Sequence, residues 1–233
     1  MKVRPILFSA PMVRAILDGR KTQFRRVVKL PSHIKHHELD LTRMQDGYPD
    51  GVRPIWGDDK EPNLFSTRNS FGKVGDRLWC RETWTRVHPG FLQHLDPDRD
   101  SHEWSTLYKA DTLGGYESSL LEFTHWMSPA VMPRRFSRID QDIVSVRVER
   151  LNEITEEDAI NEGVLSLRSQ DWDMRHFPKW RTEFDAATEN KLRPPLGPSP
   201  LECFRALWES INGPGSWGAN PWVWVIEFMR VNP

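Results

Sequence analysis

The stretch Gly19-Arg20-Lys21-Thr22-Gln23-Phe24-Arg25-Arg26 is the part of the chain around which the rest is organised. Before it, apolar residues recur with helical spacing from residue 10 to residue 18, after Ser9 at a capping position. Gly19 fits the left-handed residue that ends a helix, so we expect a helix, a turn and then a strand over residues 20–29. The basic and polar side chains of that strand predict a site for an anion or a nucleobase. A solvated basic strand is the alternative interpretation.

A second strand is predicted from Arg77 to Val87, after the turn at Gly75-Asp76. Its alternation places Glu82 between Cys80 and Trp84 on an otherwise apolar face. A carboxylate in that position indicates either the lining of a pocket or an ion pair with a buried arginine.

The segment over residues 144–149 alternates between apolar and polar side chains and predicts a strand. We expect Val144, Val146 and Val148 to face inwards, and Ser145, Arg147 and Glu149 to face outwards.

A short helix is predicted after Thr155, which with Asp158 resembles a capping box, and it ends at Gly163. Glu162 then lies in the last turn, where a carboxylate opposes the helix dipole. Because this position is unfavourable for a carboxylate, we expect Glu162 to have a role outside the helix.

The C-terminal part of the chain predicts one more helix and a long apolar strand. Ser199 and Glu202 form a full capping box, and Gly213 ends the helix. The strand over residues 222–231 is expected at the centre of a sheet, with Trp222, Trp224, Ile226 and Phe228 buried on one face.

Helices and strands do not alternate regularly, which argues against a doubly wound sheet. We expect one α+β domain over residues 1–233, a small mixed barrel with helices at its openings. Irregular composition predicts insertions at about residues 30–72, 88–130 and 165–198.

Composition limits the classes of function. The net charge of −1 excludes a basic nucleic-acid binder of the kind that is cationic throughout, so such binding needs a local patch. The two cysteines are expected to be reduced, and no apolar run approaches the length of a membrane span. The histidines His33, His36 and His37 lack a partner at metal-ligand spacing, so no metal or other cofactor is expected. The chain is predicted to be cytoplasmic.

Several blocks resemble the signature of the ASCH superfamily, small barrels related to PUA domains, in the version found in bacteriophage and prophage genomes. The resemblance implies a cytoplasmic protein of a phage-infected or lysogenic bacterium. The matching blocks are Gly19–Thr22 with Arg26, Gly75–Trp84, Met132–Arg134 with Ser137–Ile139, Ile154–Ala159 with Glu162–Gly163, and Asn220–Val225.

The resemblance implies an amidohydrolase acting on N4-acylated cytidines. Lys21 and Glu162 match two of the residues implicated in that activity, while Phe24 stands where a threonine is expected. Glu162 would activate water as a general base, Lys21 would stabilise the oxyanion, and Thr22 is the nearest replacement hydroxyl. We expect Lys21, Glu162 and the face that carries Trp84 to converge on one pocket, with Thr22 and Phe24 beside Lys21.

Two other classes are open. An RNA-binding or nucleotide-binding module, or a ribonuclease of the ASCH type, would take a nucleoside or RNA as its partner. A phage accessory protein that binds a host protein is the third class. The residues expected to contact a substrate are Phe24, Arg26, Glu82, Trp84, Arg134 and Arg138.

Overall fold

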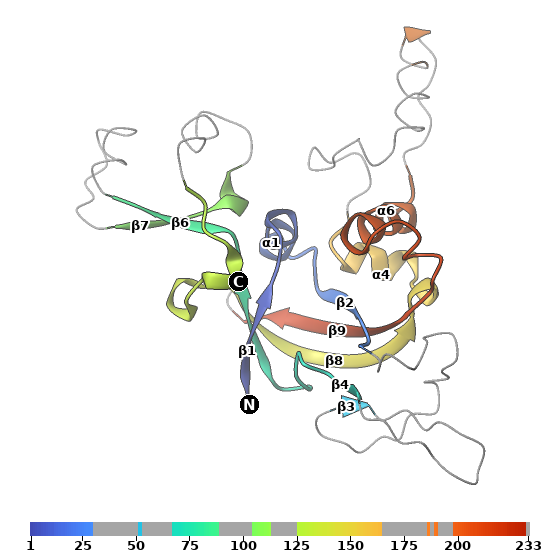
Figure 1. The fold of residues 1–233 in the computed structure, drawn as a ribbon, viewed down its shortest axis with the longest axis horizontal. Coiled ribbons are helices and arrows are strands. Elements are labelled where there is room, and N and C mark those ends of the chain that lie inside the picture. The colour runs from blue at the N-terminus through green and yellow to red at the C-terminus, as the bar shows by residue number, and fades with distance from the viewer. Residues whose placement is uncertain are drawn as a thin grey trace.

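The computed structural model describes residues 1–29, 51–52, 67–88, 104–112, 125–164, 186, 189–190 and 198–231. Its centre is a five-stranded sheet with the strand order β1-β5-β8-β9-β2 (Figure 1). The first two strands are parallel and the other neighbours are antiparallel. The five strands are β1 (Val3–Leu7), β5 (Arg77–Arg81), β8 (Asp140–Arg150), β9 (Trp222–Arg230) and β2 (Gln23–Val27).

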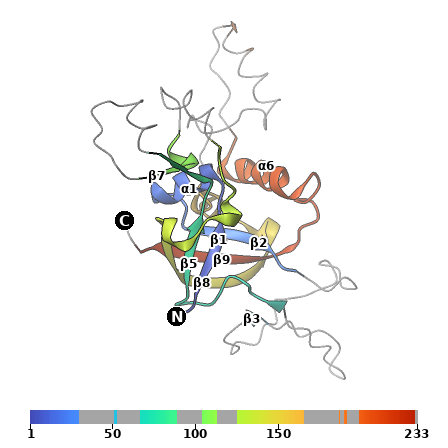
Figure 2. The same ribbon diagram turned by 60° about the vertical axis from the view of Figure 1, so that its left-hand side comes forward.

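Within the described residues, the named helices, two small sheets and short 3-10 turns complete the regular structure. The small sheets pair β3 (Gly51–Val52) with β4 (Thr67–Arg68), and β6 (Trp84–Val87) with β7 (Ser105–Tyr108). The helices are α1 (Ala10–Leu17), α4 (Glu156–Asn161) and α6 (Pro200–Asn212). The 3-10 turns are η2 (Lys109–Asp111), η3 (Pro129–Val131), η4 (Arg134–Phe136) and η5 (Leu151–Glu153). Figures 1 and 2 show α6 apart from α1, and Figure 1 shows α6 beside α4.

The predicted α+β class is confirmed, but the expectation of a closed barrel is wrong for the described strands. The sheet is open, with β1 and β2 at its two edges. Side chains join these edges in place of backbone hydrogen bonds. The ring of Phe8, just after β1, meets the ring of Phe24 in β2 edge to face, with 5.8 Å between centroids.

The predicted central position of β9 is confirmed, because it pairs with β8 on one side and β2 on the other. Alternate residues of this strand enter two different apolar clusters, so both of its faces are buried. One cluster contains the four predicted residues, Trp222, Trp224, Ile226 and Phe228, together with residues of α1. The other joins Val223 and Val225 to Ala159 of α4 and to Phe204 and Trp208 of α6.

The second cluster explains a wrong expectation about β8. Arg147 and Glu149 were expected to face solvent, and both are half-buried on the side of the sheet that α4 covers. Val144 was expected to face inwards, and it is exposed because the register of β8 shifts between Ile143 and Ser145. Val146 and Val148 do pack against the first cluster.

The predicted strand over residues 77–87 is divided at Glu82 and Thr83, which lie between β5 and β6. The second expected insertion is not wholly irregular, because it contains β7 and the turns η2 and η3. Most of the other two insertions, and the histidines at positions 33, 36 and 37, lie outside the described residues. No described helix is long and apolar enough to cross a membrane.

Candidate functional site

The first part of the site is a buried ion pair between Lys21 and Glu162, two residues that were expected to lie close together. Lys21 follows α1 and forms an isolated antiparallel bridge with Glu162, which directly follows the last residue of α4. The Lys21 Nζ donates to Glu162 Oε2 at 2.9 Å, to the Glu162 carbonyl at 2.8 Å and to the Gln23 carbonyl at 2.8 Å. All three ammonium protons therefore have acceptors within the protein.

The surroundings of Lys21 also change its acidity. The residue is only 2% exposed, and its burial lowers the pKa of the ammonium group, while the adjacent Glu162 carboxylate acts in the opposite direction. Lys21 is thus placed to hold the Glu162 carboxylate in one position.

Arg25 is the second cation that fixes Glu162. Its Nη1 donates to Glu162 Oε1 at 3.1 Å, so each carboxylate oxygen has its own cationic donor. Its Nη2 lies 3.3 Å from Glu149 Oε2 and 3.1 Å from Asp158 Oδ2. Because Arg25 is only 2% exposed, the alternative interpretation of a solvated basic strand is wrong for this residue.

Asp158 connects this pair to a larger network under α4. It accepts hydrogen bonds from Gln23 Nε2 at 3.0 Å and from Arg147 Nη2 at 3.2 Å. Burial by itself raises the pKa of Asp158, but these bonds, the bond from the Thr155 backbone and the charge of Arg25 together lower it. Arg147 also pairs with Glu149 and Glu227. The capping box was the one sequence signal that pointed to Asp158.

Gly163 allows Lys21 to approach α4 closely. Its φ is +83°, and a Cβ built on it would lie 2.8 Å from the Cβ atoms of both Ala15 and Lys21. Such distances are shorter than van der Waals contact, so only glycine fits without a shift of its neighbours.

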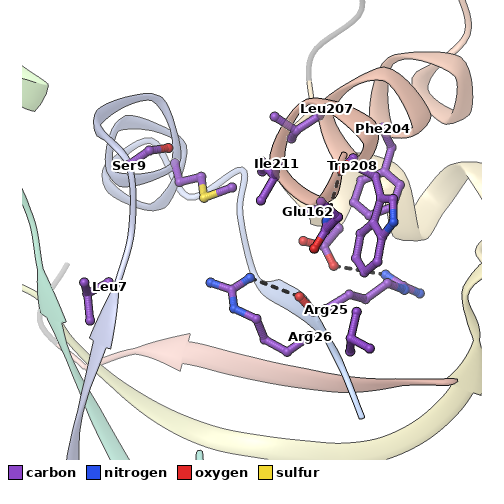
Figure 3. Close-up of a pocket in the computed structure, with 12 residues that line it drawn as sticks. Leu7, Ser9, Arg25, Arg26, Glu162, Phe204, Leu207, Trp208 and Ile211 are labelled. Carbon is purple, nitrogen blue, oxygen red and sulfur yellow. Dashed lines mark hydrogen bonds and ion pairs between the residues drawn. The ribbon is translucent and has the colours of Figure 1, made fainter. Parts of the chain in front are cut away.

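A pocket of about 430 Å³ lies beside the ion pair, between β2, α1 and α6 (Figure 3). Glu162, Arg25 and Arg26 all line it. Its apolar walls are formed by Leu7, Met12, Phe204, Leu207, Trp208 and Ile211.

Arg26 has guanidinium donors left for a ligand. Among the described interactions, its guanidinium donates one hydrogen bond, from Nη1 to the Arg25 carbonyl at 3.0 Å, and lies 5.3 Å from the Phe24 ring centroid. No described carboxylate pairs with it within 4 Å. Burial lowers the pKa of Arg26, and the charge of Glu162 acts in the opposite direction. A half-buried guanidinium of this kind favours a ligand with a carbonyl or an anionic group.

Thr22 and Phe24 do not share a pocket, so the expectation that both lie beside the Lys21 site is wrong. Thr22 is exposed and lines a separate polar pocket of about 290 Å³ with Thr155 and Asp158. Phe24 is 0% exposed and belongs to the first apolar cluster. Rings that contact it are those of Phe8, Phe71 and Phe228.

Glu82, Trp84, Arg134 and Arg138 belong to a different part of the molecule, and none of them lines the pocket of Figure 3. The ion-pair interpretation of Glu82 is confirmed. Arg138 donates to both of its carboxylate oxygens, at 2.9 and 3.0 Å, and also pairs with Asp111.

Trp84 begins β6 and stacks on Phe136, with 4.9 Å between centroids, while Arg134 pairs with Asp140. The expectation that the Trp84 face joins Lys21 and Glu162 is therefore wrong. The division of the predicted strand at Glu82 explains the separation, because β6 leaves the main sheet to pair with β7.

Among the described residues, no group of three or more His, Cys, Asp or Glu side chains could hold a metal ion. In comparisons with known proteins, no family model matches the chain, and neither the curated proteins nor the solved structures contain a match.

Proposed function

We propose that the pocket between β2 and α6 binds the base of a cytidine-type nucleoside or nucleotide. The observation that supports this most directly is the fixed carboxylate of Glu162, held by Lys21 and Arg25, in the same pocket as Arg26. A carboxylate accepts a hydrogen bond from an exocyclic amino group, and a guanidinium donates to a ring carbonyl. Cytosine carries both groups on one edge.

The walls of the pocket suit a planar ring. Trp208 and Met12 contribute aromatic and thioether surface, and stacking on such groups stabilises a bound base. Because β2 is an edge strand, its backbone also borders the pocket. The bonds from Phe228 N to Thr22 O and from Val28 N to Trp222 O direct alternate residues of β2 towards β9, which leaves the Arg25 backbone on the outer edge. The resemblance to ASCH proteins, which implies cytidine derivatives as substrates and a PUA-like fold, supports the same ligand class.

A second candidate function is hydrolysis of the amide of an N4-acylated cytidine in the same pocket. The contact of 2.9 Å between Lys21 and Glu162 favours it, because these residues match two of the three positions implicated in such hydrolysis. Glu162 would take the proton of the attacking water. Binding without hydrolysis ranks first, because the third position is the buried Phe24 and the protons of Lys21 are already donated within the protein. A cytoplasmic role in a phage-infected or lysogenic bacterium belongs to the same proposal.

Isothermal titration with cytidine, uridine and N4-acetylcytidine tests the proposal, with chromatography of the nucleosides after incubation. The parent protein should bind cytidine more tightly than uridine, because a uracil carbonyl in place of the amino group is repelled by the Glu162 carboxylate. Arg26→Gln should weaken cytidine binding at least tenfold, about 1.4 kcal/mol. Arg205→Gln, which changes an exposed arginine of α6, is the matched control and should have no effect.

Glu162→Gln should reduce the preference for cytidine over uridine, because an amide both donates and accepts hydrogen bonds. Its unfolding midpoint is measured in parallel, since the substitution leaves Lys21 and Arg25 without their carboxylate. A parent protein that binds none of the nucleosides would contradict the proposal. Release of cytidine from N4-acetylcytidine by the parent, lost in Glu162→Gln, would establish the second candidate.

A further inference from the structure

A different surface of the molecule carries aromatic and basic side chains in close contact, on one face of the β6–β7 ribbon. Directly opposed residues of an antiparallel pair share a face, and here Trp84 is opposite Tyr108 and Arg86 is opposite Thr106. The same register places His88 opposite Trp104. Their rings meet edge to face with 5.3 Å between centroids.

The contacts form a continuous series in which cations and rings alternate. The Arg86 guanidinium lies 5.3 Å from the Trp104 ring and 5.5 Å from the Phe136 ring. The Arg135 guanidinium lies 4.8 Å from the centroid of the same Phe136 ring. We call the set of Arg86, His88, Trp104, Arg135 and Phe136 the ribbon face.

The charges of Arg86 and Arg135 are not neutralised by described carboxylates. Arg86 and Arg135 are exposed, and no described ion pair within 4 Å involves either of them. The neighbouring Arg134 and Arg138 differ, because each has a carboxylate partner. Trp104 is 53% exposed, which is unusual for a side chain with so large an apolar surface.

We propose that the ribbon face binds single-stranded nucleic acid. Arg86 and Arg135 would contact successive phosphates, and a base would stack on the exposed ring of Trp104. An acidic peptide would satisfy the two guanidinium groups, but it would leave the tryptophan surface without a partner. The face draws on none of the residues that line the pocket beside Glu162, so it is a second site and not part of the first.

The test is fluorescence anisotropy of labelled single-stranded RNA and DNA of about ten nucleotides, titrated with the full chain at several salt concentrations. Replacing both Arg86 and Arg135 with alanine should reduce the slope of log K against log salt by about 1.4, because each phosphate contact on a single strand contributes about 0.7. Trp104→Ala should weaken binding at least fivefold at fixed salt with an unchanged slope, and Trp104→Phe should restore most of the affinity.

Two controls separate this proposal from the pocket. Arg205→Ala removes an exposed positive charge from α6 and should not change the slope. The ribbon variants should bind cytidine as the parent does, and Arg26→Gln should bind the oligonucleotides as the parent does. Absence of oligonucleotide binding by the parent would overturn the proposal, as would unchanged affinity and slope in the three ribbon variants. Tighter binding of an acidic peptide than of either oligonucleotide would also overturn it.

Discussion

Glu162 shows how a single residue can be unfavourable in its own helix and favourable in the molecule. At the end of α4 its charge opposes the helix dipole. Two buried cations, Lys21 and Arg25, compensate for that position by donating to different oxygens of the carboxylate. A buried charge is tolerated when its hydrogen bonds are satisfied in this way, and it is then held in one orientation. The carboxylate is therefore preorganised for a ligand in the pocket.

Gly163 should be the most sensitive glycine near this pair. Gly163→Ala introduces strain at φ +83° and also places a methyl group 2.8 Å from the Cβ atoms of Ala15 and Lys21. We expect a loss of more than about 1 kcal/mol in the free energy of unfolding, measured by urea denaturation. Gly19→Ala is the matched control, because φ there is +73° but no atom lies within 4 Å of the added carbon. Equal losses in the two variants would show that the contact with Lys21 contributes nothing.

Phe24 should behave as a core residue and not as a ligand contact. Phe24→Thr removes a fully buried ring from a cluster of phenylalanines and should cost about 3 kcal/mol of unfolding free energy. Phe24→Leu keeps most of the apolar volume and should cost clearly less. Urea denaturation measures both. Phe24→Thr that keeps the stability of the parent and gains hydrolysis of N4-acetylcytidine would instead place residue 24 at the site of reaction.

At the scale of elements, α4 is a short helix with two functions. The Asp158 carboxylate accepts a hydrogen bond from the Thr155 backbone N–H at the start of α4 and so caps the helix. It also accepts hydrogen bonds from Gln23 of β2 and Arg147 of β8, which hold the helix against the sheet. A helix of this length has little stability of its own and depends on such contacts.

The lowered pKa of Asp158 predicts a pH dependence. A carboxyl whose pKa is lower in the folded state binds fewer protons there than in the unfolded state. The free energy of unfolding therefore rises with pH between the folded-state and unfolded-state pKa values. The contribution is present above the unfolded pKa and is lost as the pH falls through the folded pKa, below about 4. The thermal midpoint of Asp158→Asn should therefore fall less steeply than that of the parent between about pH 5 and pH 3. The pKa values of Asp76 and Asp142 are also lowered. Their contribution to the pH dependence of stability is the same in the parent and in Asp158→Asn. Identical pH profiles would contradict the role given to Asp158.

Elements with local signals could be predicted from the sequence, and elements that depend on distant partners could not. The capping boxes at Thr155 and Ser199 and the apolar periodicity that follows predicted α4 and α6, because both signals lie within the helices themselves. The alternation in β8 was misread at Val144, since the shift of register appears only when β9 is paired with it. Arg25 looked like a surface residue because its three carboxylate partners are more than a hundred positions away in the sequence.

At the scale of the whole molecule, the pocket is assembled from segments that no sequence spacing connects. Arg26 comes from β2, Glu162 from the end of α4 and Trp208 from α6. Lys21 and Glu162 could be paired in advance only through the family resemblance. The same reasoning wrongly added Trp84, because nothing local shows that β6 leaves the main sheet. The structure thus separates the predicted residues: Arg26 and Glu162 line the pocket, and Glu82, Trp84, Arg134 and Arg138 lie away from it.

A crystal structure of the protein grown with saturating cytidine would show whether the Glu162 pocket holds a nucleobase. We predict electron density for the base between Arg26 and Glu162. Its amino group should lie within about 3 Å of the carboxylate, and its carbonyl oxygen should lie at a similar distance from the guanidinium. Cytidine bound elsewhere, with this pocket empty at saturation, would contradict the account.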